Sequence, residues 1–150
     1  MTTIDCIKSN FTNAIVARCS EKGCKLRLNG LSDYIVLKGE RICQDRKICD
    51  CIIFVRNNRI IGIVELKSRT AHPSEIKEKL INGSIIALDI LEKCRDKQNY
   101  EFYHLVLSKS WRPPEYRVII SRRIIVRGKR YDIIPKRCGV SFSAVISDLK

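Results

Sequence analysis

Two short apolar runs with a polar turn between them constrain the fold of this 150-residue chain more than any other feature. The runs cover residues 49–55 and 59–68, and Asn57-Asn58 lies between them. Runs that are apolar on both faces are typical of strands inside a sheet that is covered on both sides. Asn tolerates the positive φ angles of a two-residue type I′ turn. The segment therefore predicts a β-hairpin at the centre of a covered sheet.

The remaining periodicity predicts an α/β domain. Residues 33–38 and 101–108 have strand character, and residues 10–22 and 73–93 predict helices. Gly83, inside the second helix, costs about 1 kcal/mol relative to Ala and allows a kink there. Segments 117–126 and 130–135 flank Gly128 and predict a second hairpin. We expect one domain over residues 1–150, with a mixed central sheet flanked by helices, a core over about 10–108 and a basic C-terminal β extension over 109–150.

The expected register of the central hairpin places two acids opposite each other. With Asn57 and Asn58 in the turn, residues equidistant from it face each other, so Asp50 faces Glu65 with Cβ atoms ~4.5–5.5 Å apart. Alternate residues of a strand share a face, so Lys67 lies beside Glu65. A three-residue turn would instead shift the register and separate the acids.

This grouping of charges at the end of two apolar strands predicts a metal site. Like charges that face each other destabilise a sheet, and burial opposes ionisation of a carboxyl group. Mg²⁺ or Mn²⁺ relieves both costs, because these cations take oxygen ligands and keep several waters. Lys67 would lie where it can orient a water or stabilise charge on a phosphate, which indicates phosphodiester hydrolysis. The structural alternative is a core strand that emerges into solvent at Glu65, with Asp50 in a turn.

The chain has Asp50 and, after fourteen intervening residues, Glu65-Leu66-Lys67. This pattern resembles the motif of the PD-(D/E)XK (restriction-endonuclease-like) nuclease superfamily. The resemblance covers roughly residues 33–108 and includes the order strand, hairpin, strand, helix. It implies a restriction-endonuclease-like core in which Asp50, Glu65 and Lys67 are catalytic. It also implies that Asp50, Glu65 and the backbone carbonyl of Leu66 bind the metal.

Two further acids are candidates for this site. Glu40 follows the first expected strand and could reach the metal. Glu21 is the nearest match to the acid that many members of the superfamily carry on their first helix. Cys49 stands where the name of the motif has Pro.

The charge balance indicates a polyanionic partner. The chain has 29 Lys and Arg against 16 Asp and Glu, a formal net charge of +13, which favours nucleic acid, with DNA preferred. Segment 109–137 carries ten Lys and Arg but two acids, a net +8, interleaved with Trp111, Tyr116 and Tyr131. The alternative to a nucleic-acid surface is a basic hairpin that faces solvent and whose aromatic side chains belong to the core. The expected nucleic-acid-binding residues are Lys77, Lys79, Lys109, Arg112, Arg122, Arg123, Arg127, Lys129 and Arg130.

The eight cysteines admit several interpretations. The absence of a C-x2-C pair disfavours a zinc or iron–sulfur site. We expect most of them to be small buried hydrophobic residues, with one or two disulfides as the alternative. The sequence shows no signal peptide, no apolar span and no basic amphipathic helix, which predicts a cytoplasmic protein that does not bind membranes.

Together these features predict a Mg²⁺- or Mn²⁺-dependent nuclease that acts on DNA, or alternatively on RNA. The competing interpretation is a non-catalytic nucleic-acid-binding module with the same fold. A homodimer that cuts both strands is left open.

Overall fold

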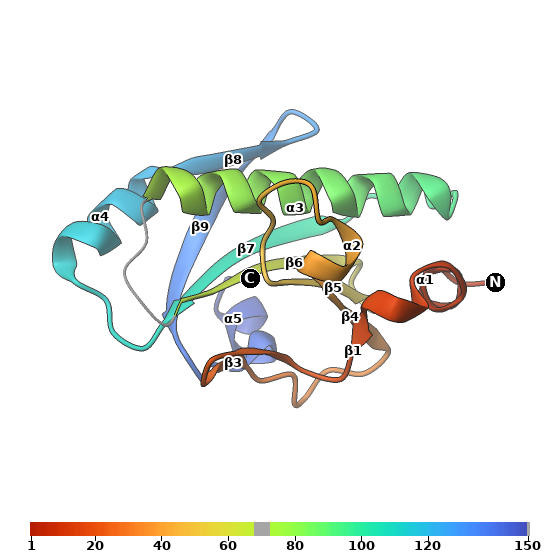
Figure 1. Cartoon of the computed structure of the whole chain (residues 1–150), viewed down its shortest axis with the longest axis horizontal. Coiled ribbons are helices and arrows are strands. Elements are labelled where there is room, and N and C mark those ends of the chain that lie inside the picture. Colours follow the sequence, from red (N-terminus) through yellow and green to blue (C-terminus); the bar gives the residue numbers. More distant parts are fainter. Residues whose placement is uncertain (68–72, 150) are drawn as a thin grey trace.

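The chain folds as an α/β domain with a mixed central sheet flanked by helices, as expected (Figure 1). The computed structural model describes residues 1–67 and 73–149. In chain order the elements are α1 (Thr3–Asn10), η1 (Thr12–Ala14), β1 (Ile15–Val16), β2 (Cys19–Glu21), β3 (Cys24–Leu26), β4 (Tyr34–Lys38), α2 (Gly39–Ile42), β5 (Cys51–Val55), β6 (Ile60–Lys67), α3 (Pro73–Lys93), β7 (Glu101–Ser108), α4 (Pro113–Ser121), β8 (Arg123–Val126), β9 (Lys129–Arg137) and α5 (Phe142–Asp148).

The main sheet has the order β1-β4-β5-β6-β7-β9-β8. Strands β4, β5 and β6 form an antiparallel meander. Helix α3 then connects β6 to the parallel strand β7, as a parallel pair requires. Strand β9 runs parallel to β7, and β8 closes the edge antiparallel to β9.

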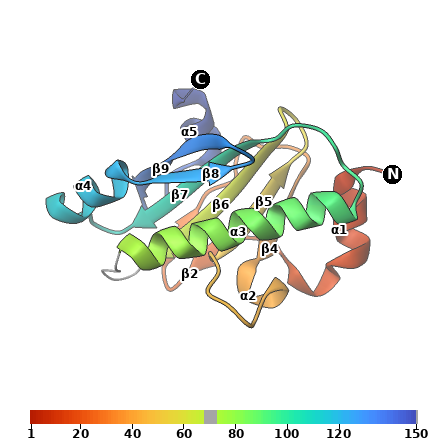
Figure 2. The same ribbon diagram turned by 90° about the horizontal axis from the view of Figure 1, so that it is seen from above.

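Each face of the sheet has its own hydrophobic core. Helices α1 and α3 cover one face and pack on Ile52, Phe54 and Ile61. Helix α5 and the β2–β3 hairpin cover the other, on Ile53 and Val64. Figure 2 shows α3 lying along the sheet. Coverage on both sides explains why every residue of β5 is buried.

The central hairpin has the register expected from the sequence. Val55 pairs with Ile60 and Cys51 with Val64. Within the turn the positive φ angles fall on Asn58 and Arg59 rather than on the two asparagines. The register is unchanged, because the Arg59 N–H still donates to the Arg56 carbonyl at 3.3 Å and closes a turn centred on Asn57 and Asn58.

The long helix and the strand after it also match the prediction. Helix α3 spans Pro73–Lys93 and β7 spans Glu101–Ser108. Gly83 does not interrupt the helix. A Cβ atom there would lie 2.5 Å from Cys49 Sγ and 2.9 Å from Ile63 Cγ2, so the missing side chain lets α3 approach the sheet closely.

The expected helix over residues 10–22 is wrong. Ile15 and Val16 instead form strand β1, because they pair with Leu37 and Val36 at the edge of the sheet. The first helix lies earlier, at α1, where Thr2 and Asp5 form a capping box. This Thr-x-x-Asp spacing is a local signal for the start of a helix.

The C-terminal hairpin is present, but its first strand is shorter than expected. Residues 113–121 form α4, which begins with two prolines, residues that favour the first turn of a helix. Strands β8 and β9 follow and pair from Arg123 with Asp132 to Val126 with Lys129. Arg127 and Gly128 both have positive φ, as a type I′ turn requires.

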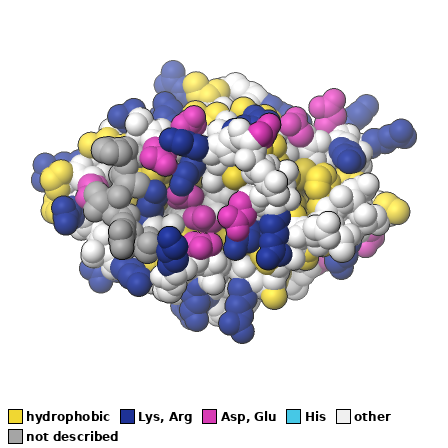
Figure 3. Space-filling view, viewed as in Figure 1, with side chains coloured by type: hydrophobic (Ala, Val, Ile, Leu, Met, Phe, Trp, Pro, Cys, Tyr) yellow, Lys and Arg dark blue, Asp and Glu magenta, His cyan; other side chains and the backbone are white. Residues whose placement is uncertain are grey.

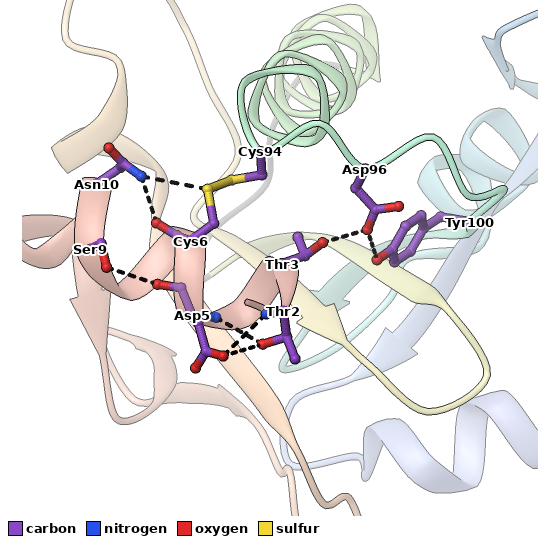
Figure 4. The surroundings of a disulfide bond; sticks show 9 residues. All are labelled: Thr2, Thr3, Asp5, Cys6, Ser9, Asn10, Cys94, Asp96 and Tyr100. Carbon is purple, nitrogen blue, oxygen red and sulfur yellow. Dashed lines mark hydrogen bonds between the residues drawn. A yellow bond between two sulfur atoms is a disulfide. The ribbon is translucent and has the colours of Figure 1, made fainter.

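Six of the eight cysteines form disulfides, more than the sequence led us to expect. Cys19–Cys51 and Cys24–Cys138 attach the β2–β3 hairpin to the main sheet and to the end of β9. Cys6–Cys94 joins α1 to the residue after α3 (Figure 4). Beside it, Thr3 and Tyr100 both donate to Asp96 Oδ2, at 2.5 and 2.6 Å. The N-terminal helix is therefore held by a covalent bond and by hydrogen bonds.

Candidate active site

Asp50 and Glu65 meet at the end of β5 and β6, on the face that α3 covers. The last pair of the hairpin is Cys51 with Val64, so Asp50 and Glu65 are the next residues of the two chains beyond it. Asp50 Oδ2 accepts a hydrogen bond from the Leu66 N–H at 2.7 Å, which holds the carboxylate against β6. Glu65 is only 2% exposed. The sheet thus brings together the two acids that the sequence singled out.

Two lysines complete the cluster around Glu65. Glu65 Oε2 lies 3.4 Å from Lys67 Nζ and 3.0 Å from Lys79 Nζ. The other oxygen, Oε1, is buried and has no hydrogen-bond partner among the described residues. A buried acceptor without a partner is costly, and a bound ion, a water or a proton shared with Asp50 would relieve that cost.

The environment of Asp50 disfavours two negative charges at this position. Burial, followed by the charge of Glu65, raises the pKa of Asp50 to about 7, and the Leu66 N–H opposes that rise. Burial lowers the pKa of Lys79, but the hydrogen bond and the charge of Glu65 outweigh it and leave the pKa raised. The two acids therefore share their site only with cations or a proton.

Cys49 precedes Asp50 in the chain and lies close to this cluster, but it is unsuited to nucleophilic chemistry. It is fully buried, and its Sγ donates to the Cys51 carbonyl at 3.4 Å. Burial, and then the charges of Glu65 and Asp50, raise the pKa of its thiol. A thiol that stays protonated is a poor nucleophile.

The donor atoms at this site suit a hard divalent cation. The carboxylates of Asp50 and Glu65 supply oxygen ligands, and one of those oxygens has no hydrogen-bond partner in residues 1–67 and 73–149. Because the N–H and C=O of a strand residue point to the same side, the Leu66 carbonyl faces the side of β6 from which its N–H reaches Asp50. Mg²⁺ commonly takes one or two carboxylates and completes its shell with water. The residues present therefore fit the cation, although no group of three or more His, Cys, Asp or Glu that could hold a metal occurs in the described part of the chain.

Glu40 and Glu21 are not part of the cluster. Both pair with Lys38, at 3.2 and 3.7 Å. Lys38 shares its face of β4 with Val36, which packs in the core opposite α3. The alternation of side chains along β4 therefore keeps these two acids on the face away from Asp50.

The expected nucleic-acid-binding residues do not form one surface. Arg112, Arg122 and Arg123 lie on or beside α4, and Lys109 lies just after β7. Arg127 lies at the other end of α3, where it lines a cavity with Glu92 and Arg95. Helix α3 has 21 residues and is therefore roughly 30 Å long, which separates the two groups. The β8–β9 hairpin leads from the end of α4 towards the far end of α3 and so carries Arg127, Lys129 and Arg130 away from the acid cluster.

Some of these basic side chains already have partners within the protein. Lys129 Nζ pairs with Glu101 at 2.7 Å, and Arg123 Nε pairs with Asp132 at 2.8 Å. Lys77 is half-buried on α3. Figure 3 shows acidic side chains near the middle of one face of the molecule, with Lys and Arg side chains around them.

Lys79 is the site residue whose place the sequence did not reveal. It was expected on the surface of the helix, in contact with phosphate, whereas its side chain is 23% exposed and bonded to Glu65. Its position between the buried residues Ile76 and Leu80 is a weak signal that this side chain faces the sheet.

Comparison of the chain with known families, curated proteins and solved structures found no match. Among the described residues, no helix is long and apolar enough to cross a membrane.

Proposed function

We propose that this protein is a Mg²⁺- or Mn²⁺-dependent nuclease that hydrolyses phosphodiester bonds, with DNA as its preferred substrate. One observation carries the proposal: Asp50, just before β5, and Glu65, near the end of β6, lie together with two lysines beside Glu65. Within the part of the chain that the structure describes, one buried oxygen of Glu65 has no hydrogen-bond partner. A polyanionic substrate also agrees with the net charge of +13.

The proposed cation ligands are Asp50, Glu65 and the backbone carbonyl of Leu66. When bound, the cation acts as a Lewis acid towards the phosphate and lowers the pKa of an attacking water. The protein contributes the fixed position of the ligands, since the Leu66 N–H orients Asp50 at 2.7 Å and the buried strand β6 orients Glu65.

We propose different roles for the two lysines beside Glu65. Lys67 is 12% exposed and Lys79 is 23% exposed, so both ammonium groups lie in a partly dry environment. Charges in such an environment stabilise developing negative charge on a phosphate more strongly than they do in water. Lys67 is the proposed catalytic lysine, and Lys79 holds the orientation of Glu65.

We also propose that the chain belongs to the PD-(D/E)XK superfamily, on the strength of the Asp50 and Glu65-Leu66-Lys67 motif. The order of β4, β5, β6, α3 and β7 supports this assignment, because the motif falls where the resemblance requires it. A cytoplasmic location remains part of the proposal. Three disulfides agree with it in a hyperthermophile and otherwise favour an oxidising compartment.

A non-catalytic nucleic-acid-binding module is the second candidate. The observation that favours it is the neutralisation of Glu65 by Lys67 and Lys79, which could make the cluster a purely structural ion pair. In that case the two acids would not be needed for any reaction. A homodimer of such a module would serve nucleic-acid binding alone.

Cleavage assays separate the two candidates. Plasmid and single-stranded DNA are incubated with the protein in Mg²⁺ or Mn²⁺, beside the variants Glu65→Gln and Lys67→Met. We expect the wild type to cleave and each variant to lose at least 100-fold in rate, because removing one charged group at such a site costs about 2.7 kcal/mol or more. Glu75→Gln is the matched control, since Glu75 lies 4.0 Å from Lys79 but does not touch Glu65.

The nuclease proposal is overturned if the wild type does not cleave, or if both variants retain wild-type rates. Unchanged DNA affinity in the two variants, together with an absence of cleavage in the wild type, would establish the binding module instead.

A further inference from the structure

Helix α4 presents apolar side chains to solvent. Tyr116, Val118 and Ile120 are 41%, 36% and 42% exposed, and Ile119 is the one buried residue of the helix. A helix that only covers a core buries its apolar side chains. Tyr116 and Ile120 are four residues apart and share one face of the helix, whereas Val118 lies on its other flank. Exposed apolar side chains that cluster on one face mark a contact surface.

The same helix also carries positive charge. Arg112 and Arg122 flank α4 and Arg117 lies within it, whereas Glu115 is its single acid. Arg123 has an internal role, because its Nη1 donates to the Ile120 carbonyl at 2.8 Å and so caps the end of the helix. The surface formed by Arg112, Tyr116, Arg117 and Ile120, here called the α4 surface, therefore combines cations with apolar groups.

The α4 surface lies beside the candidate active site. Ser108, the last residue of β7, pairs with Lys67, and α4 begins five residues later. Both ribbon views place α4 next to the first turns of α3, the part of that helix from which Lys79 reaches Glu65 (Figures 1 and 2). A nucleic acid held at the acid cluster would thus extend onto α4.

The position of α4 is fixed before any ligand binds. Trp111 Nε1 donates to the Lys136 carbonyl at 2.8 Å and anchors the start of the helix to β9. The Trp111 ring packs edge-to-face on Tyr116, with centroids 6.2 Å apart. The tyrosine is therefore presented with little loss of side-chain freedom.

We propose that the α4 surface binds the unpaired bases of single-stranded DNA, so that the substrate of the proposed nuclease contains a single-stranded stretch. The inference rests on the proposed function and names its substrate class. A duplex keeps its bases stacked inside and presents phosphates, from which Ile120 gains nothing. Unpaired bases expose flat apolar faces, on which Tyr116 can stack while the arginines bind phosphates.

A second copy of this chain fits the surface less well. A symmetric contact between two α4 surfaces would bring Arg112 and Arg117 of each copy together, in a protein that already carries a net charge of +13. The charge favours a polyanion instead. A membrane of anionic lipids shares that charge, and the experiment separates it from DNA.

The test is DNA affinity measured by fluorescence anisotropy in EDTA, with a labelled single-stranded oligonucleotide and a blunt duplex of the same sequence. Tyr116→Ser and Ile120→Ser are each expected to weaken single-strand binding about tenfold, the effect of one lost base contact, and to leave duplex binding within about twofold. Ile125→Ser is the matched control, because Ile125 is 64% exposed but lies on β8 rather than on α4. It is expected to change neither affinity.

The inference is overturned if the α4 variants lose no affinity, or lose it equally for single strand and duplex. It is also overturned if the substitutions instead abolish self-association, measured by sedimentation, or binding to phosphatidylserine vesicles. Because EDTA prevents cleavage, a selective loss of single-strand affinity supports the role of α4 even if the wild type later fails to cleave in Mg²⁺. That second failure would count against the nuclease proposal alone.

Discussion

The two faces of the central sheet differ in their buried polar residues and in their disulfides. The face under α3 carries three buried polar residues, Glu65, Ser84 and His104. On the opposite face the buried polar residue among those described is Ser141, which caps α5. That opposite face is instead fastened by two disulfides. Both faces are cross-linked, since Cys6–Cys94 joins α1 to the end of α3. The difference is that the face under α3 also carries charged and polar groups that cost stability, whereas the opposite face combines two disulfides with an almost wholly apolar core.

The largest expected effect on stability comes from the face of the sheet that carries two disulfides. The double variant Cys24→Ser, Cys138→Ser removes a cross-link between residues 114 positions apart. The chain-entropy model predicts a loss of about 4–5 kcal/mol in the free energy of unfolding, because the unfolded chain regains freedom. Urea denaturation measures this loss. Cys43→Ser is the control, since Cys43 is a free thiol, and a similar loss there would contradict a special role for the disulfide.

The next effect concerns the buried histidine under α3. Burial lowers the pKa of His104 to about 3, whereas an unfolded histidine titrates near 6.5. Between these values the unfolded state binds the extra proton. Protonation of His104 in the unfolded state should therefore lower the free energy of unfolding as the pH falls below about 6.5, by up to ~1.4 kcal/mol per pH unit. The raised pKa of Asp50 acts in the opposite direction over the same range.

His104→Phe should flatten this pH dependence. The ring can be replaced because it stacks on Phe102 and contacts Tyr131, while Ser84 keeps its hydrogen bond to the Leu80 carbonyl. The measurement is urea denaturation between pH 6.5 and 5, made in the Asp50→Asn background so that the titration of Asp50 does not mask that of the histidine. An unchanged slope in the variant would show that other groups cause the pH dependence.

A smaller loss is expected where α3 touches the sheet. Gly83→Ala would place a Cβ atom 2.5 Å from Cys49 Sγ. Overpacking costs typically 1–3 kcal/mol, which outweighs the gain of about 1 kcal/mol in helix propensity. Thermal denaturation should therefore show a lower Tm, whereas Ser74→Ala, at an exposed position of the same helix, should not lower it. A higher Tm for Gly83→Ala would mean that the contact is loose.

The smallest effect has the opposite sign. Asp50→Asn removes a charge that burial and Glu65 disfavour, and the Asn side-chain oxygen can still accept from the Leu66 N–H. We expect the variant to be more stable by about 1 kcal/mol and to lack cleavage, as functional sites often sacrifice stability. Destabilisation in the same denaturation experiment would instead identify Asp50 as a structural residue.

The sequence predicts best those elements whose signals are local and strong. The central hairpin, α3 and β7 follow from apolar runs, from a proline at the start of the helix and from an Asn-Asn turn. The pairing of Asp50 with Glu65 follows from the same register, so the core of the candidate site needed no long-range information.

The rest depends on contacts that the sequence does not display. Strand β1 is two residues long and exists because β4 lies beside it. The disulfide Cys6–Cys94 joins residues 88 positions apart, and its pairing follows from the fold alone. The contact of Lys79 with Glu65 depends on how α3 is rotated about its axis, which periodicity does not determine to within one residue.

The central claim is that the Asp50–Glu65 pair holds a divalent cation. Calorimetric titration of Mn²⁺ into the wild-type protein and into Glu65→Gln tests it without any substrate. We expect one Mn²⁺ site in the wild type and a loss of at least tenfold in affinity in Glu65→Gln, with the affinity of Glu75→Gln unchanged. Equal affinity in wild type and Glu65→Gln, or no binding to the wild type, would contradict it.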